Sequence, residues 1–186
     1  MAELHQIDGW DAAWWAKAEP IYDHAFPKEG RKPERVIRSL LERGVGSLYV
    51  LTEEGEPVAM AIAGIVRKHE RRALVIDYLA VAARRREEGY GRELIGRLKQ
   101  QVGQEQPLDM LVIEVEAEDT PDNRGRIRFW QRCGFQLTSY VHTYIWVPEP
   151  YRAMVLPLRQ GAGVPLDGET LFSYITDFHQ RAYRGR

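Results

Sequence analysis

The spacing of apolar residues along the chain predicts several helices and strands in mixed order. Apolar residues that recur every three or four positions, as from Leu94 to Val102, are typical of a helix with one buried face. Apolar runs bounded by turn residues are typical of strands. The predicted helices cover residues 11–26, 33–43, 92–102 and 123–132. The predicted strands cover residues 47–52, 58–68, 71–82, 109–117, 135–147 and 152–158. This order predicts an α/β fold in which helices cover both faces of a mixed sheet.

Turn and breaker residues delimit several of these elements. Residues 54–57 predict a hairpin turn between two strands. Gly44 is expected to end the second helix. Pro20 lies inside the first predicted helix and is expected to kink or divide it, because proline lacks the backbone N–H that an interior position needs.

The amino-acid composition of the chain changes after Leu158. Residues 159–168 are rich in glycine and predict a linker. Apolar residues then recur at helical spacing, at Leu171, Phe172, Ile175 and Phe178. We therefore expect one domain over residues 1–158, followed by a linker and a C-terminal helix over residues 159–186. That helix either packs back on the domain or forms the contact of a homodimer.

The composition is that of a soluble globular protein, with 44% hydrophobic and 28% charged residues in 186. The net charge of −1 argues against a general nucleic-acid binder, because no basic excess is present to displace counterions. A single cysteine excludes an internal disulfide and suits a reducing compartment. The N-terminus shows no export signal, and the longest apolar run, residues 58–66, is too short to span a bilayer. We expect a cytoplasmic protein without a membrane partner.

A short basic loop with two glycines stands between a predicted strand and a predicted helix. It reads Arg86-Glu87-Glu88-Gly89-Tyr90-Gly91 and follows two further arginines. The free N–H groups at a helix start, together with the helix dipole, form an anion site suited to phosphates. The glycines lack the Cβ atoms that would keep a phosphate away from these amides. The loop therefore predicts a pyrophosphate-binding site.

Two familiar phosphate-binding loops do not fit the spacing. A nucleoside-triphosphate loop requires a lysine followed by serine or threonine after its last glycine, but Arg92 follows Gly91. A dinucleotide-binding fingerprint requires a third glycine three positions later, where the chain has Leu94.

The pattern Arg-x-x-Gly-x-Gly instead resembles the acetyl-coenzyme A loop of the GNAT superfamily of N-acetyltransferases. Residues 75–81 look like the strand that enters this loop in the family. Residues 123–135 resemble the second family signature, Asn-x-x-Ala-x-x-Phe-Tyr-x-x-x-Gly-Phe. The resemblance covers roughly residues 48–158, and two positions depart from it: Arg126 replaces an alanine and Trp130 replaces a tyrosine.

This resemblance implies a GNAT-like fold with a mostly antiparallel sheet and transfer of an acetyl group from acetyl-CoA directly to a primary amine of a small molecule or peptide. Main-chain groups on the strand before the loop would pair with the pantetheine arm, and one amide would face the thioester oxygen as an oxyanion-type donor. Arg84 or Arg85 would meet the adenosine 3′-phosphate. The expected cofactor-binding residues are Leu79, Ala80, Val81, Arg84, Arg86, Glu87, Glu88, Gly89, Tyr90, Gly91, Arg92, Asn123 and Trp130.

The candidate general base is a carboxylate on a predicted strand. An alkyl amine is almost fully protonated at neutral pH and must lose a proton before it attacks a thioester. Glu114 and Glu116 alternate with apolar residues, which places both carboxylates on one strand face. The same face could instead meet solvent or pair with arginines. Asp77 is a second candidate base, although a structural role suits it better.

The candidate general acid is a tyrosine. Trp130 stands where the family commonly has a tyrosine, and an indole N–H is not available for acid catalysis. Tyr144 is the residue we expect to act instead, with Tyr140 as the other choice. A reaction without a general acid is the third choice, because a coenzyme A thiolate is a tolerable leaving group.

Two other functions are open on the sequence alone. The departure at Trp130 and the additional C-terminal helix suit a non-catalytic acyl-CoA sensor or interaction module. A nucleotide-phosphate binder unrelated to acyl transfer would use the same loop. The five histidines are isolated from one another, so we expect no metal site.

Overall fold

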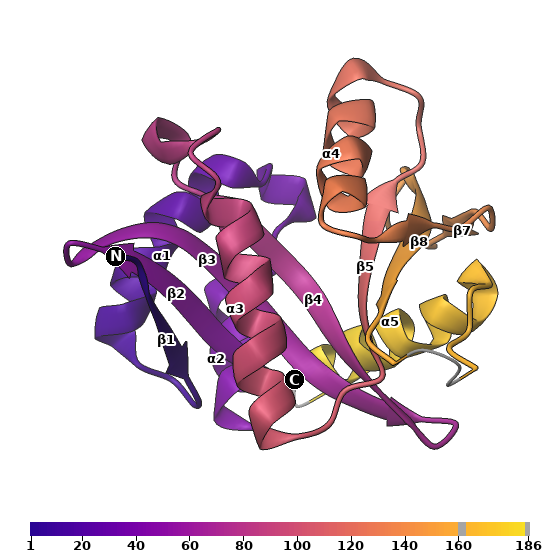
Figure 1. Cartoon of the computed structure of the whole chain (residues 1–186), viewed down its shortest axis with the longest axis horizontal. Coiled ribbons are helices and arrows are strands. Elements are labelled where there is room, and N and C mark those ends of the chain that lie inside the picture. The colour runs from indigo at the N-terminus through magenta and orange to yellow at the C-terminus, as the bar shows by residue number, and fades with distance from the viewer. Residues whose placement is uncertain (160–162, 185–186) are drawn as a thin grey trace. The chain divides into compact units, whose positions relative to one another are not determined.

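The computed structural model of this protein describes residues 1–159 and 163–184. The chain forms two compact units, each assembled from separate stretches of sequence. The first unit comprises Met1–Gly64, Ile76–Glu105 and His179–Arg186, and the second comprises Ile65–Val75 and Gln106–Phe178. The elements of both units are labelled in Figure 1.

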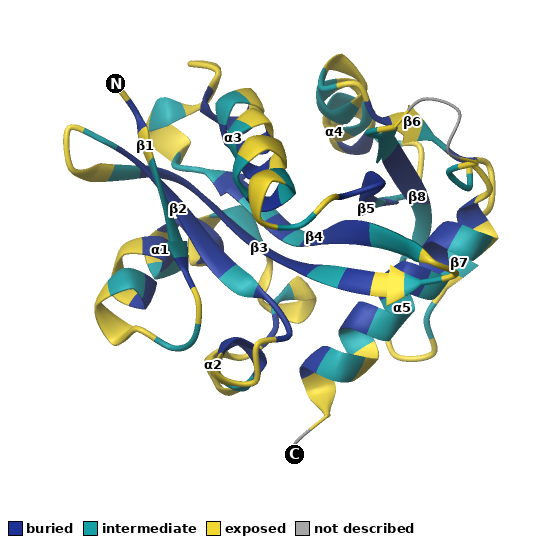
Figure 2. Cartoon of the chain, turned by 60° about the horizontal axis from the view of Figure 1, so that its bottom comes forward, coloured by how far each residue is buried: buried dark blue, intermediate teal, exposed yellow. Residues whose placement is uncertain are grey.

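The first unit is a layer of strands between helices. Its strands are β1 (Glu3–Ile7), β2 (Ser47–Glu53) and parts of β3 (Glu56–Lys68) and β4 (Arg71–Val81), and its helices are α1 (Ala12–Ala25), α2 (Glu34–Glu42) and α3 (Tyr90–Glu105). β2 pairs antiparallel with both β1 and β3. In Figures 1 and 2, α3 lies over one face of these strands, and α1 and α2 lie on the other face. Val50, Met60 and Ile62 are fully buried because both faces are covered.

Helix α1 begins at a side-chain cap and runs through a proline. Asp11 Oδ1 accepts hydrogen bonds from the backbone N–H groups of Ala13 (2.9 Å) and Trp14 (3.0 Å), which would otherwise lack an acceptor. Pro20 lies inside one helix and does not divide it, so a division at this residue is wrong. The aromatic and aliphatic side chains that α1 buries on either side of Pro20 stabilise the helix in spite of the missing hydrogen bond.

The second unit contains the other end of the sheet. Its elements are β5 (Met110–Glu116), α4 (Pro121–Arg132), β6 (Gln136–Leu137), β7 (His142–Thr143), β8 (Pro150–Pro157) and most of α5 (Gly168–Tyr183). β5 pairs in parallel with the first part of β4 and antiparallel with β8. The strand order is β1-β2-β3-β4-β5-β8-β6, with β7 paired to β8. The expected α/β fold with a mixed, mostly antiparallel sheet is confirmed.

Helix α5 packs on its own chain. The four apolar residues that predicted this helix (Leu171, Phe172, Ile175 and Phe178) are 0–2% exposed. Asp167 caps the helix by accepting a hydrogen bond from Thr170 N at 2.8 Å, and this bond lowers the pKa of the Asp167 carboxyl. Part of the predicted linker, residues 160–162, lies outside the described residues. Among those the structure describes, no helix has the length and apolar content that crossing a membrane requires.

The strand predicted over residues 135–147 is wrong. Only the two-residue strands β6 and β7 form there. Thr138 still bonds to β8, since its backbone N–H and hydroxyl both donate to Ala153 O, and the β7 pairing with β8 begins at His142. Beyond β6, Val141, Ile145 and Trp146 are exposed, so the apolar residues that suggested a strand have no sheet face to cover.

Strand β1 was not predicted. Its residues read Glu-Leu-His-Gln-Ile, which is too short and too polar to mark a strand by its pattern. It forms because β2 offers an antiparallel partner from Glu3 opposite Thr52 to Ile7 opposite Leu48.

Candidate active site

The basic loop of the first unit has the geometry of an anion site. A 3-10 turn, Ala83–Arg85, follows β4, and α3 begins at Tyr90. Gly89 has a φ of 90°, in the left-handed region that glycine adopts without strain, and a Cβ added there would meet open space. The first helical hydrogen bond runs from Glu93 N to Gly89 O at 3.0 Å. The N–H groups that precede Glu93 in the first turn therefore have no acceptor within the helix.

The arginines of this loop have different roles. Arg85 donates to Glu53 at 2.8 Å and to Glu88 at 2.9 Å, so its guanidinium is held within the protein. Arg84, Arg86 and Arg92 are exposed and form no ion pair with any described residue. Of the two arginines expected near the 3′-phosphate, Arg84 is therefore the one with an uncommitted charge.

Tyr90 fixes the start of α3. Its side chain is buried, and its hydroxyl makes short hydrogen bonds with Glu53 on β2 and with Arg85. Between the two glycines, a tyrosine thus anchors the helix N-terminus to the sheet.

The strand before the loop has backbone groups outside the ladder with β5. That parallel ladder covers Ala73–Val75 paired with Met110–Val112 and includes none of Leu79, Ala80 and Val81. The side chain of Ala80 is buried, and those of Leu79 and Val81 are half-buried. Ala82 N donates to Val58 O at 2.8 Å, which fixes the strand end on β3.

Asp77, the second candidate base, lies in a buried ion pair. Lys32 Nζ donates to both carboxylate oxygens at 2.9 and 2.7 Å, and each of these side chains is 4% exposed. His179 Nδ1 on α5 lies 3.1 Å from Lys32 Nζ and 3.7 Å from Asp77 Oδ1. The Asp77 carboxylate is therefore held in an ion pair with Lys32, which is a structural role.

Two tyrosines hold the backbone of Lys32. Tyr22 donates to Lys32 O at 3.0 Å, and Lys32 N donates to the Tyr78 hydroxyl at 2.9 Å. Burial raises the pKa of both tyrosines, so their hydroxyls stay protonated at neutral pH. Sequence reasoning missed Lys32, which stands in a polar loop without any local pattern that predicts burial.

In the second unit, Glu114 on β5 lies beside two tyrosines. The Tyr144 hydroxyl donates to Glu114 Oε2 at 2.7 Å, so the predicted base and acid are directly hydrogen-bonded. The rings of Tyr144 and Tyr151 meet edge to face with centroids 5.6 Å apart. Tyr151 is paired with Glu116 in the β5–β8 register. Both glutamates are half-buried and lie on one face of β5, as expected.

Tyr151 has a raised pKa, and sequence reasoning gave this residue no catalytic role. Burial, followed by the negative charges of Glu114, Glu116 and Glu149, raises the pKa of Tyr151 to about 12. This hydroxyl therefore remains protonated at neutral pH, with burial as the main cause of the raised pKa and the glutamate charges as a further one.

Helix α4 carries the two remaining predicted residues. Asn123 is buried, with Nδ2 donating to Glu118 O at 3.0 Å and Oδ1 accepting from Arg126 at 2.7 Å. Both polar atoms are thus held at the first turn of α4. Trp130 is half-buried and packs its ring against Phe129 and Phe135, with centroids 5.3 and 5.0 Å away.

The loop fits the phosphates of acetyl-CoA. A left-handed glycine, a helix start and three exposed arginines give backbone donors and positive charge without a side chain that blocks them. Within the described residues, no group of three or more His, Cys, Asp or Glu is arranged to hold a metal ion.

Comparison with known proteins identifies the family. The model of the acetyltransferase (GNAT) family matches residues 10–135, and the chain belongs to this family. Proteins of this family are acetyltransferases that use acetyl-CoA, so the expected enzyme class and acyl donor are confirmed. A search of curated proteins found no match to the sequence.

Solved structures share the fold at low sequence identity. A putative GNAT acetyltransferase from Bacteroides thetaiotaomicron is 20% identical with a TM-score of 0.70, over 96% of this chain and 94% of that one. The ribosomal-protein-S18-alanine N-acetyltransferase of Escherichia coli is 20% identical with a TM-score of 0.64, over 89% and 99%. A Bacillus subtilis acetyltransferase in complex with CoA is 13% identical with a TM-score of 0.59, over 86% and 100%.

Proposed function

We propose that this protein transfers an acetyl group from acetyl-CoA directly to a primary amine of a small molecule or peptide. The observation that carries the proposal is the hydrogen bond between Tyr144 and Glu114, because it joins a proton acceptor and a proton donor in a chain of the GNAT family. The Escherichia coli structure of the same fold is that of an enzyme that acts on a protein alanine, which supports an amine as the acceptor.

The loop of the first unit binds the donor in this proposal. The amides at the start of α3 and the side chains of Arg84, Arg86 and Arg92 hold the phosphates. When bound, acetyl-CoA supplies an acetyl group activated as a thioester. Backbone groups of Leu79, Ala80 and Val81 hold the pantetheine arm.

Glu114 and Tyr144 of the second unit carry out the proton transfers in this proposal. Glu114 takes a proton from the acceptor ammonium group, directly or through a water molecule, and leaves a neutral amine. The neutral amine nitrogen attacks the thioester carbon, the C–S bond breaks, and Tyr144 gives its hydroxyl proton to the departing thiolate. Tyr144 regains a proton from Glu114 Oε2, the atom to which it is already hydrogen-bonded, and the second proton of the acylated nitrogen passes to solvent water. Glu116, on the same strand face, adds negative charge that attracts a cationic amine.

The proposal is tested with purified protein, acetyl-CoA and a panel of primary amines and short peptides. Released thiol is measured by absorbance and the acetylated amine by mass spectrometry. We expect one acetylated amine for each thiol released. Coenzyme A binding without turnover across the panel would contradict the proposal and favour the acyl-CoA sensor instead.

A further inference from the structure

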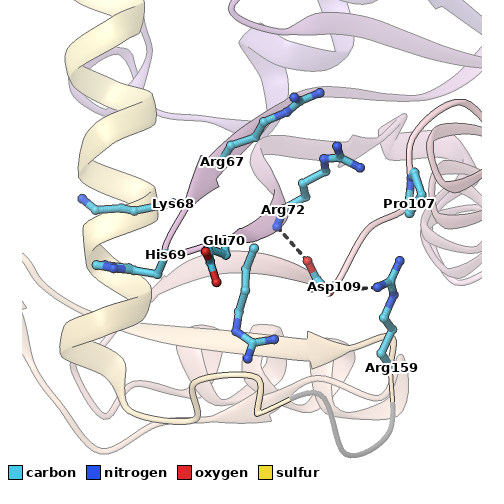
Figure 3. A pocket seen from close by; sticks show the side chains of 9 residues that line it. Arg67, Lys68, His69, Glu70, Arg72, Pro107, Asp109 and Arg159 are labelled. Atoms are coloured by element: carbon cyan, nitrogen blue, oxygen red, sulfur yellow. Dashed lines mark hydrogen bonds and ion pairs between the residues drawn. The ribbon is translucent and has the colours of Figure 1, made fainter.

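A hollow lined mainly by cations lies in the second unit, at the hairpin where β3 ends and β4 begins (Figure 3). Its volume is about 510 Å³. The lining carries four arginines (Arg67, Arg71, Arg72 and Arg159) and one lysine, against two carboxylates. Because the whole chain has a net charge of −1, this excess of positive charge is a local feature.

The turn of this hairpin contains residues that do not favour its backbone conformation. Its two turn residues, His69 and Glu70, have φ values of 52° and 59°, in the left-handed region where such turns favour asparagine and glycine. A two-residue turn places Arg67 opposite Arg72 across the two strands. Like charges directly opposite each other destabilise a strand pair, so this arrangement brings two guanidinium groups together at a cost to the fold.

These two guanidinium groups are not neutralised by the protein. Arg67 donates to the uncharged amide of Gln106 at 2.7 Å. Arg72 uses its backbone N–H, not its guanidinium, to bond Asp109 Oδ2 at 2.8 Å. The other Asp109 oxygen faces Arg159 at 3.6 Å. Among the residues that the structure describes, neither Arg67 nor Arg72 therefore has a carboxylate partner.

The side chains converge on one side of the hairpin. In Figure 3, Arg67 and Arg72 extend to the side of the hairpin on which Pro107 lies, whereas Lys68 and His69 extend to the opposite side. Arg159 approaches the same space from the end of β8. Three guanidinium groups from three strands or strand ends thus share one concave surface.

We propose that this hollow binds a small molecule that carries two or more phosphate groups. Planar guanidinium groups match the oxygen geometry of phosphate and form paired hydrogen bonds with it. The volume is that of a small-molecule site, and its concave shape suits a compact ligand better than an extended acidic peptide. This site is separate in sequence from the loop over residues 86–92 and does not depend on acetyl transfer.

The test is calorimetric titration of inorganic triphosphate into the full chain at low salt, without coenzyme A, because coenzyme A carries phosphate groups and would compete for the hollow. Variants of Arg67 and Arg72 distinguish binding in the hollow from binding at the loop over residues 86–92. We expect saturable binding that weakens as sodium chloride is added. Arg72→Gln should weaken binding about tenfold or more, because a charged hydrogen-bonding partner is lost. Arg67→Gln should act in the same direction.

A control variant distinguishes a specific binding site from nonspecific electrostatic attraction. Arg35→Gln removes an exposed arginine on α2 and should change the triphosphate affinity by less than about twofold. No saturable binding, or an equal loss in Arg35→Gln and Arg72→Gln, would overturn the proposal. Tighter binding of a glutamate hexapeptide than of triphosphate would overturn it in favour of an acidic peptide. Failure of the proposed acetyl transfer would show separately, as no released thiol and no acetylated amine in the amine panel.

Discussion

At the scale of single residues, the account depends on a carboxylate that is already oriented. The Tyr144 hydroxyl holds Glu114 at 2.7 Å, and Tyr151 packs against Tyr144, so the carboxylate has a defined position before any amine arrives. A preoriented base loses less entropy when it acts, which is a general source of catalytic efficiency.

The first prediction concerns this carboxylate. Glu114→Gln should lower kcat/KM for the best amine about 100-fold or more, because general base catalysis contributes about that much. Tyr144→Phe should lower kcat with a smaller effect on KM. Steady-state thiol release measures both. Glu118→Gln, which changes an exposed glutamate just after β5, is the control and should leave the rate unchanged. An equal rate in Glu114→Gln and in the wild type would remove Glu114 from the mechanism.

The second prediction concerns the pKa of Tyr151. Burial and the nearby glutamates raise it to about 12, whereas an unfolded tyrosine ionises near 10. Between these values the unfolded state loses a proton that the folded state keeps, so the free energy of unfolding falls as pH rises through this window. An absorbance titration of the wild type minus Tyr151→Phe should place the midpoint near pH 12, and Glu116→Gln should move it down. A midpoint near 10 would contradict both causes, and an unchanged midpoint in Glu116→Gln would show that this glutamate does not act on the hydroxyl.

At the scale of elements, two adjacent residues, Gly89 and Tyr90, determine where helix α3 begins. Gly89 needs a left-handed backbone, and Tyr90 needs a buried site beside Glu53. The sequence pattern predicts the turn and the helix, because glycines and apolar spacing are local signals. The pattern does not predict that Arg85 pairs with Glu53, which is 32 residues away.

The third prediction follows from the backbone of Gly89. Gly89→Ala should weaken coenzyme A binding about fivefold to tenfold, because alanine in the left-handed region costs about 1 kcal/mol and the loop relaxes away from it. Calorimetry of coenzyme A binding measures this change. Gly96→Ala, on the same helix with open space around its Cβ, should leave binding unchanged and stabilise the fold slightly. Similar affinities in the two variants would argue against the loop as the phosphate site.

The fourth prediction concerns the buried ion pair on β4. Lys32→Met should lower the free energy of unfolding by about 3–5 kcal/mol, because it leaves the Asp77 carboxylate buried without its partner. The double variant Lys32→Met/Asp77→Leu should recover most of that loss. Urea denaturation measures both. Arg38→Met, which breaks an exposed pair with Glu42, is the control and should cost less than about 1 kcal/mol. No recovery in the double variant would contradict a simple ion-pair role.

At the scale of the whole molecule, most of the fold could be predicted from local patterns. The glycine loop, the alternation of Glu114 and Glu116, and the apolar spacing of α5 are signals that a few neighbouring residues contain. What could not be predicted comes from contacts between distant segments. β1 forms only because β2 offers an edge, and Lys32 is buried only because Asp77 and His179 meet it. The strand predicted over residues 135–147 fails for the converse reason, because its apolar residues find no partner.

The central claim is that an acetyl group passes from acetyl-CoA to an amine without stopping on the protein. The most direct measurement is a single-turnover experiment, in which the protein is mixed with acetyl-CoA and an accepted amine, quenched at short times and analysed by intact-protein and small-molecule mass spectrometry. The account predicts that acetylated amine forms at the rate of thiol release while the protein mass stays unchanged. An acetylated protein that forms first and decays as the product appears would contradict it.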